Sequence, residues 1–288
     1  MIAIYKRELR AYFQSMTGYV FIAFLICFTG IYFMAYNLNY GYPYFSYVLS
    51  GTTFIYFIAI PFLTMRSFAE ERKNKTDQLL FTSPVGLFGI IAGKYLAMVT
   101  ILAVPCIVYL MFPWMIKAQG TAYVLQDSIA IFVFFLMGCV FIAIGMFLSS
   151  LTESQILAAI GTVGVLLVLY LWSGILEFIP DSAIVNAAGI VLVLSALVLG
   201  VWKMTQNWFL AGILEAVVLI ANVVIYLVKS SLYEGFLGEV LGKLDLIAIF
   251  SNVTSSSVLD ISGLILYVSL IGVFLFLTIE MIQKRRWS

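Results

Sequence analysis

The chain lacks histidine entirely and carries little charge of either sign. Charged residues make up 10% of its 288 residues, whereas soluble domains carry about 25%. Without histidine, sites that use an imidazole as a metal ligand or an acid–base catalyst are excluded. The scarcity of charge leaves 64% hydrophobic residues and a mean hydropathy of +1.11, which predicts an integral membrane protein. Because the net charge is only +1, we expect no nucleic-acid partner.

Cysteine is also scarce, and common catalytic motifs are missing. Cys27, Cys106 and Cys139 lie in apolar runs without a CxxC spacing, so we expect buried thiols rather than a zinc site or redox pair. The nearest approach to a nucleotide-binding P-loop is GLFGIIAGKY at Gly86–Tyr95, but it lacks a glycine five residues before Gly93 and has Tyr95 in place of Ser or Thr. GxSxG and HExxH motifs are absent. We therefore predict no enzyme activity and no catalytic, cofactor or metal site.

What the sequence does contain is eight apolar segments, each near the length of about 20 residues that a helix needs to cross a bilayer. A segment inside lipid must satisfy its backbone polar groups within itself, so we expect helices. The predicted fold is an all-α integral membrane protein with about eight transmembrane helices in a single domain over residues 1–288. The spans are Tyr19–Leu38, Tyr47–Met65, Leu87–Met111, Ser128–Leu148, Gln155–Leu176, Ala183–Trp202, Trp208–Val228 and Ser262–Met281.

Basic residues set the predicted orientation. If the N-terminus is cytosolic, 12 of the 15 lysines and arginines flank the spans on the cytosolic side. Only Lys117, Lys229 and Lys243 then lie outside. The positive-inside rule predicts that both termini are cytosolic, in a multi-pass protein of a bacterial plasma or inner membrane.

Two stretches outside the spans have amphipathic patterns. Residues 1–15 predict an interfacial helix, which either anchors at the membrane surface or also contacts a cytosolic partner. Residues 229–261 are too polar to span and are expected outside, as one or two short helices followed by a serine-rich turn at SNVTSSS. The apolar face of the first helix comprises Ile2, Tyr5, Leu9, Tyr12 and Phe13, and the stripe of the outer segment comprises Leu232, Phe236, Leu237, Val240, Leu241 and Leu244.

The stretch from Arg66 to Pro84 holds seven of the 29 charged residues and is predicted to be a cytosolic loop. Asn74 or Thr76 can cap a short helix in it, Asp77 favours the first turn, and Pro84 is a natural stop. Leu79, Leu80 and Phe81 form an apolar knob on this loop. The knob either docks into a groove of a partner protein or rests on the membrane surface.

Glu215 is the one ionisable residue well inside a predicted span, in the sequence GILEAVVLIAN. Such residues are costly in lipid and mark functional sites. Glu215 can bind a cation, relay a proton, or be a protonated group hydrogen-bonded within the helix bundle. Asn222 lies seven residues later on the same helical face and is a candidate for the same polar patch.

Taken together, these features resemble the permease subunits of ABC-2 type transporters, in particular the branch associated with gliding motility. The shared features are an N-terminal KRE-L helix, the loop EERKNKTDQLLFTSPV and a last span that ends in KRRW. The loop pattern of that branch is carried by Glu70, Glu71, Thr76, Asp77, Leu79, Leu80 and Pro84.

The resemblance implies a permease, most often an exporter, driven by a separate ATP-binding subunit that binds the ATP. It implies two permease subunits, as a homodimer or heterodimer, and two ATPases, in contact with membrane lipid. The loop would then be a cytosolic coupling helix, and the N-terminal helix a second contact. The expected coupling residues are Glu70, Glu71, Arg72, Thr76, Asp77, Leu79 and Leu80. Gly145 and Ser149 are small enough to permit close helix packing.

The chain departs from the family in one respect. Members typically have six spans, whereas this chain has an extra helical hairpin at residues 183–228, which contains Glu215. Two other functions stay open at this point. One is an ion-coupled secondary transporter that uses Glu215, although no internal repeat is evident. The other is a membrane scaffold of a secretion or motility machine that transports nothing.

Overall fold

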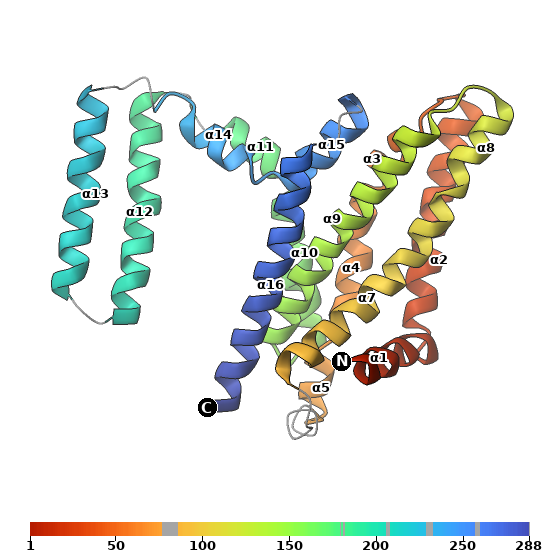
Figure 1. Cartoon of the computed structure of the whole chain (residues 1–288), viewed down its shortest axis with the longest axis horizontal. Coiled ribbons are helices and arrows are strands. Elements are labelled where there is room, and N and C mark those ends of the chain that lie inside the picture. The colour runs from red at the N-terminus through yellow and green to blue at the C-terminus, as the bar shows by residue number, and fades with distance from the viewer. Residues whose placement is uncertain are drawn as a thin grey trace. The chain divides into compact units, whose positions relative to one another are not determined.

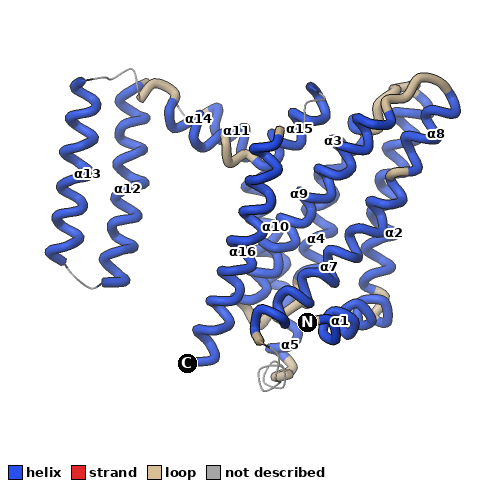
Figure 2. The backbone as a smooth tube through the Cα atoms, viewed as in Figure 1, coloured by secondary structure: helices blue, strands red, loops and turns tan. Residues whose placement is uncertain are grey.

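A computed structural model describes residues 1–76, 86–178, 180, 182–205, 208–228, 233–256 and 260–287. In these ranges the regular structure is helical throughout, with no strand (Figure 2). The helices form two compact units. The first comprises Met1–Tyr170 and Leu246–Ser288, and the second comprises Leu171–Asp245. The all-α fold predicted from the sequence is therefore confirmed for the described residues.

The first unit contains the N-terminal helix and most of the candidate spans (Figure 1). The N-terminal helix α1 lies at the same end of this unit as α5, where it packs against α7 and α2. The helices are α1 (Ile2–Gln14), α2 (Thr17–Phe33) continued by a π-helix η1 (Met34–Asn39), α3 (Ser46–Thr52), a 3₁₀ turn η2 (Thr53–Ile55), α4 (Tyr56–Thr64), α5 (Ala69–Lys73), α7 (Leu87–Tyr109), α8 (Met111–Gln119), α9 (Val124–Leu151), α10 (Gln155–Tyr170), α15 (Leu246–Ser256) and α16 (Ile261–Trp287).

Helix α9 is the centre of the first unit. It packs against α4, α7, α10 and α16, and 72% of its most apolar window is buried. A helix that is apolar on every side is suited to such a position, and α9 has no charged residue between Asp127 and its end at Leu151. These four neighbouring helices therefore all pack against the same central helix.

Among the residues that the structure describes, five helices are long and apolar enough to cross a membrane. They are Thr17–Asn39, Ser46–Lys73, Leu87–Gln119, Val124–Leu151 and Ile261–Lys284. Each overlaps a span predicted from the sequence, and the structure extends most of them by several residues. Pro61 and Pro105, which interrupt two predicted spans, both lie inside helices, α4 and α7.

The predicted span Gln155–Leu176 is wrong at its end, because α10 stops at Tyr170 after 16 residues. The chain turns at Leu171 and begins a separate helix, α11 (Trp172–Glu177). Two hydrogen bonds within the second unit favour this break. The Trp172 indole N–H donates to the Leu241 carbonyl oxygen at 2.9 Å, and the Ser173 hydroxyl donates to the Asp245 carboxylate at 2.5 Å.

The second unit consists of α11, α12 (Ala183–Thr205), α13 (Trp208–Val228) and α14 (Phe236–Gly242). The two long helices α12 and α13 pack against each other, at the positions where the sequence predicts the extra hairpin. The Asn186 amide oxygen accepts the Leu237 N–H at 3.2 Å and so caps the start of α14. Gly189 leaves room for the Leu237 side chain, which lies 2.5 Å from where a Cβ would be.

The outer segment predicted at residues 229–261 contains α14 and α15, and its residues 229–232 and 257–259 lie outside the described part. The serine-rich stretch was predicted as a turn, but it is helical through Ser256. In this helix the Thr254 and Ser255 hydroxyls both donate to the Ser251 carbonyl oxygen, at 2.9 and 2.8 Å. Hydroxyl groups that bond back to the carbonyl group three or four residues earlier are compatible with a helix.

Candidate functional site

Four charged side chains from three helices meet at the end of the first unit where α1 and α5 lie. Nζ of Lys94 in α7 is 2.8 Å from Oε1 of Glu71 in α5 and 3.3 Å from Oε1 of Glu8 in α1. The Arg7 guanidinium contacts the same two carboxylates, at 2.5 Å from Glu8 and 3.2 Å from Glu71. We call this network of Arg7, Glu8, Glu71 and Lys94 the Lys94 cluster. It joins α1, α5 and α7, which are separated in the sequence.

Lys94 is the buried member of the cluster, with 2% of its side chain exposed. Its ammonium also donates to the Ser67 carbonyl oxygen at 2.9 Å and lies 5.3 Å from the centre of the Phe68 ring. Removing an ammonium from water costs several kcal/mol unless charges and hydrogen bonds replace the lost solvent. Two carboxylates and a carbonyl group supply them here, which is why a lysine can occupy this apolar helix.

The residue before Lys94 brings α1 close to α7. A Cβ at Gly93 would lie 3.2 Å from the Ile4 side chain and 3.2 Å from the Met1 carbonyl oxygen, so only glycine leaves these contacts undisturbed. The sequence GK at positions 93 and 94, which superficially resembles the end of a P-loop, therefore has a packing role and a charge-pairing role.

The structure shows which face of α1 packs against the rest of the first unit. Ile4 and Tyr12 are buried, with Glu8 between them on the same face, whereas Ile2 is 71% exposed. The predicted apolar face comprises Ile2, Tyr5, Leu9, Tyr12 and Phe13, and the prediction assigns no position to Glu8. The pairing of Glu8 with Lys94 helps to fix which side of α1 faces α7.

A second ion pair connects α5 to the start of α2. The Arg66 guanidinium donates to both carboxylate oxygens of Glu70, at 2.6 and 3.0 Å, and to the Thr17 hydroxyl at 2.7 Å. A bidentate pair of this kind fixes the relative orientation of both side chains. Nearby, the Tyr12 hydroxyl of α1 donates to the Leu63 carbonyl oxygen of α4 at 3.2 Å.

Helix α9 supports α5 from the core through one hydroxyl group. The Ser149 hydroxyl accepts the backbone N–H groups of Phe68 and Ala69, both at 3.2 Å, and donates to the Met65 carbonyl oxygen at 3.2 Å. These N–H groups stand at the start of α5, where no partner exists within the helix. Ser149 therefore acts as an N-cap supplied by a neighbouring helix.

One turn before this cap, Gly145 faces Thr64 of α4. A Cβ at Gly145 would lie 2.3 Å from Oγ1 of Thr64. Two non-bonded atoms cannot lie this close, so one of the two residues would have to move. The close packing predicted at Gly145 and Ser149 thus occurs within this chain, between α9 and the α4–α5 segment.

Beside the Lys94 cluster lies an open recess of about 530 Å³. Partial burial lowers the pKa of the Arg7 guanidinium there, but its hydrogen bond and charge interaction with Glu8, followed by those with Glu71, raise the pKa above its ordinary value overall. The described residues contain no group of three Asp, Glu or Cys side chains that would hold a metal ion. The recess is lined by Arg7, Glu8, Ala11, Gln14, Ser15, Arg66, Glu70, Glu71, Asn74, Thr76 and Lys94.

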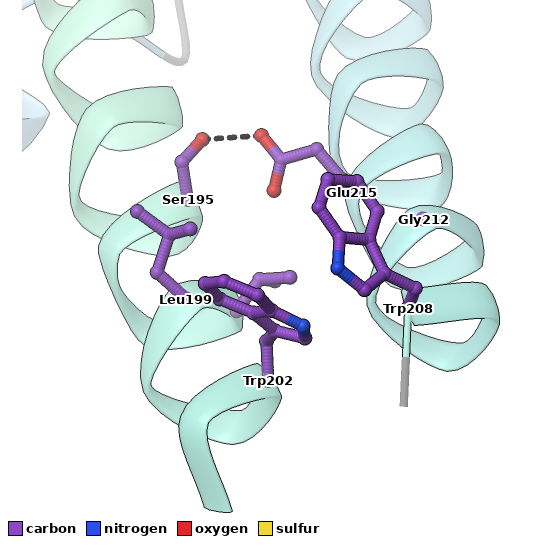
Figure 3. Close-up of a pocket in the computed structure, with 7 residues that line it drawn as sticks. Ser195, Leu199, Trp202, Trp208, Gly212 and Glu215 are labelled. Atoms are coloured by element: carbon purple, nitrogen blue, oxygen red, sulfur yellow. Dashed lines mark hydrogen bonds between the residues drawn. The ribbon is translucent and has the colours of Figure 1, made fainter. Parts of the chain in front are cut away.

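The intramembrane candidate Glu215 belongs to the second unit. The Ser195 hydroxyl of α12 donates to its carboxylate at 2.6 Å, and both residues line a recess of about 410 Å³ between α12 and α13 (Figure 3). Asn222 is buried but does not line this recess. Its carbonyl oxygen accepts a hydrogen bond from the Tyr233 hydroxyl at 3.3 Å.

A family model described as ABC-2 family transporter protein matches residues 2–204. The chain belongs to the ABC-2 transporter family. No curated protein and no solved structure matches the chain. The family match spans the Lys94 cluster, Ser149 and Gly145, and it ends inside α12, so Glu215 lies beyond it. Membership of this family indicates that the chain is a membrane-spanning subunit of a transporter and is not its catalytic subunit.

The coupling residues suggested by the ABC-2 resemblance fall into two groups. Glu70, Glu71 and Arg72 belong to α5, and Thr76 follows it, with its hydroxyl donating to the Glu71 carbonyl oxygen at 3.2 Å. The remaining members, Asp77, Leu79 and Leu80, lie outside the described residues, as does Pro84. The first group is thus directly connected to the Lys94 cluster through Glu71 and to the core through Ser149.

Sequence reasoning missed the partners that hold α5 in place. Lys94 was counted only as one of the basic flanking residues, and Glu8 was not singled out. A signal was present, since Lys94 is the only charged residue in α7 (Leu87–Tyr109) and directly follows a glycine. A lysine within an apolar helix predicts a buried carboxylate partner, but which carboxylate depends on the fold.

The cap on α5 leads to a first prediction. Replacing Ser149 with Ala removes the acceptor of two N–H groups and the donor to Met65, so we expect a loss of about 1–2 kcal/mol in stability. The apparent Tm of the detergent-solubilised protein, followed by gel filtration after heating, measures this loss. Ser150→Ala is the matched control, because the Ser150 hydroxyl donates within α9 to Phe147. Equal Tm values for the two variants would contradict the cap.

Proposed function

We propose that this chain is the transmembrane permease subunit of an ABC exporter and that a separate ATP-binding subunit drives it. Membership of the ABC-2 family supports this proposal, because its permeases usually work with such a subunit. Two permease subunits and two ATP-binding subunits would form the working transporter, with ATP bound by the partner. The coupling surface would consist of α5 and the residues that follow it.

The observation that carries the proposal is the Lys94 cluster. A partner that pushes on the segment after α5 needs a rigid connection from that segment to the helices that line the transport path. Glu71 supplies the first connection through Lys94 of α7, and Glu8 adds α1 to the same joint. Such a joint allows the two conformations of the bundle to be biased by events in a partner.

Two further contacts make α5 a suitable lever. The Glu70 carboxylate is held by Arg66, which also bonds to Thr17 at the start of α2. The N-terminus of α5 is bonded to Ser149 of the central helix α9. A displacement of α5 would therefore act on α2, α7 and α9 together.

The proposal includes a topology of eight crossings. In addition to the five candidate spans, α10, α12 and α13 would cross the membrane. This arrangement follows from the apolar character of these helices and from the distribution of basic residues, which favours cytosolic termini. The Lys94 cluster would then lie at the cytosolic face of a bacterial plasma membrane. The loop pattern from Glu70 to Pro84 supports placement in the gliding-motility branch.

The test is a double substitution, Leu79→Asp with Leu80→Asp, in the tagged chain expressed in its source cells, where an ATP-binding partner would be present. We expect the tagged wild-type chain to co-purify an ATPase and the double variant to lose it, because two carboxylates cannot be buried in an apolar groove. Leu125→Asp is the control, since Leu125 is 77% exposed at the start of α9. The proposal fails if the wild-type chain never retains an ATPase and the double variant still transports.

A further inference from the structure

We infer that the hairpin of α12 and α13 carries a binding site for an amphiphilic organic amine, separate from the proposed coupling surface. The site is the recess of about 410 Å³ between the two helices, a volume within the range of about 300–1,000 Å³ that is usual for small-molecule sites. It is lined by Ser195, Val198, Leu199, Trp202, Trp208, Gly212 and Glu215. Figure 3 shows that both helices contribute side chains to it.

The carboxylate of Glu215 gives the site its charge preference. One of its oxygens accepts the Ser195 hydroxyl at 2.6 Å. The ion pairs found in the described part of the chain do not include Glu215. A carboxylate in apolar surroundings is stabilised most by an opposite charge, and a ligand with a protonated amine would bring that charge.

The two tryptophans give the site its preference for an organic cation over a metal ion. The rings of Trp202 and Trp208 pack edge to face, with their centres 5.5 Å apart and an interplanar angle of 71°. Both indoles line the same recess as the Glu215 carboxylate, and the Trp208 ring lies nearer to it than the Trp202 ring (Figure 3). Indole faces attract ammonium groups through the ring quadrupole, and they also cover an apolar ligand body. An inorganic cation would need several oxygen ligands, whereas the described residues that line the recess offer one carboxylate and one hydroxyl.

A third feature predicts that the ligand carries a hydrogen-bond acceptor. The Trp202 indole nitrogen is buried and has no hydrogen-bond partner among the described residues. Buried N–H groups in folded proteins are nearly always bonded, so an unbonded one inside a recess marks a place for a ligand atom. The ligand class is therefore an amine, an apolar body and an acceptor such as an ether or carbonyl oxygen.

The recess is also accessible. Trp208 is 78% exposed and Leu199 is 58% exposed, so a ligand can enter beside them. Gly212 widens the space on the α13 side, because a Cβ there would meet no atom within 4 Å.

The experiment uses the full chain in lipid nanodiscs and calorimetric titration with 4-phenoxybutylamine, whose ether oxygen is the acceptor. We expect saturable binding of the amine and at least tenfold weaker binding of 4-phenoxybutanol, which matches it except for the charge. Glu215→Gln is expected to weaken binding of the amine at least tenfold. Glu239→Gln, which changes an exposed carboxylate of the same unit, is expected to leave the affinity unchanged.

Trp202→Phe provides a second variant that keeps an aromatic ring but removes the N–H, and we expect several-fold weaker binding. Gel filtration confirms that each variant is folded before titration. The inference is overturned if the alcohol binds as tightly as the amine, if the wild-type chain shows no saturable binding, or if Glu215→Gln and Trp202→Phe both bind normally. Because the wild-type comparison of amine and alcohol requires no variant, it decides even if one substitution prevents folding. Binding of an ATPase is not involved, so the result is independent of the proposed function.

Discussion

Replacing Lys94 with Met is expected to lower the stability of the chain by about 3 kcal/mol. The substitution keeps an apolar side chain of similar length but leaves Glu8 and Glu71 without their buried cation. Breaking a buried ion pair from one side costs about 3–5 kcal/mol. The lower end applies here, because Arg7 still contacts both carboxylates. The apparent Tm of the purified protein measures the effect.

Two matched variants separate charge pairing from other effects of the Lys94 substitution. Lys243→Met breaks the exposed Lys243–Glu239 pair, in which both side chains are more than two-thirds exposed, at 73% and 71%, and should change the stability little because exposed pairs contribute about 0–1 kcal/mol. The double variant Lys94→Met with Glu71→Gln leaves only Arg7 and Glu8 as a neutral pair, so it should recover part of the loss. If Lys94→Met is no less stable than Lys243→Met, the cluster does not hold α1, α5 and α7 together.

Replacing Gly145 with Ala is expected to cost about 1–3 kcal/mol, although alanine is the better helix former. The new Cβ would lie 2.3 Å from Oγ1 and 2.9 Å from Cβ of Thr64. The second contact is with an atom fixed to the backbone, so a rotamer change cannot relieve it. Helices α9 and α4 would have to separate, and overpacking of this kind typically costs about 1–3 kcal/mol.

The control has the opposite expected sign. Gly161 lies in α10, where an added Cβ would meet no atom within 4 Å, so Gly161→Ala should raise stability by up to about 1 kcal/mol through helix propensity. Combining Gly145→Ala with Thr64→Gly removes the obstructing side chain and should recover part of the loss. Thermal unfolding monitored by gel filtration distinguishes these cases. A Gly145→Ala variant as stable as Gly161→Ala would show that α9 and α4 are not in tight contact.

The helices could be predicted largely from composition, since long apolar segments must be helical in a membrane. The predicted span Ser128–Leu148 lies within α9, and Trp208–Val228 has the same bounds as α13. The end of α10 could not be predicted in this way. It depends on hydrogen bonds from Trp172 and Ser173 to residues about 70 positions later in the chain.

The candidate site was only partly predictable, for a similar reason. The charged stretch after Arg66 is visible in the sequence, and so are Glu70 and Glu71 within it. The identity of the cation that pairs with Glu71 depends on how α1 and α5 lie against α7, and a modest rotation of α1 about its axis would remove Glu8 from Lys94. The Ser149 cap requires an equally specific approach of α9, which residue types alone do not encode.

The shortness of α10 has a consequence for the membrane around this transporter. Sixteen residues rise about 24 Å at about 1.5 Å per residue, whereas the hydrocarbon layer is about 30 Å thick. One side of α10 bears exposed apolar residues such as Ile156, Ile160 and Val163, so in the proposed topology it meets lipid directly. The bilayer would thin locally to match it. Longer acyl chains would then increase the mismatch between the bilayer and α10. The force on this helix would be greater in thick membranes than in thin ones.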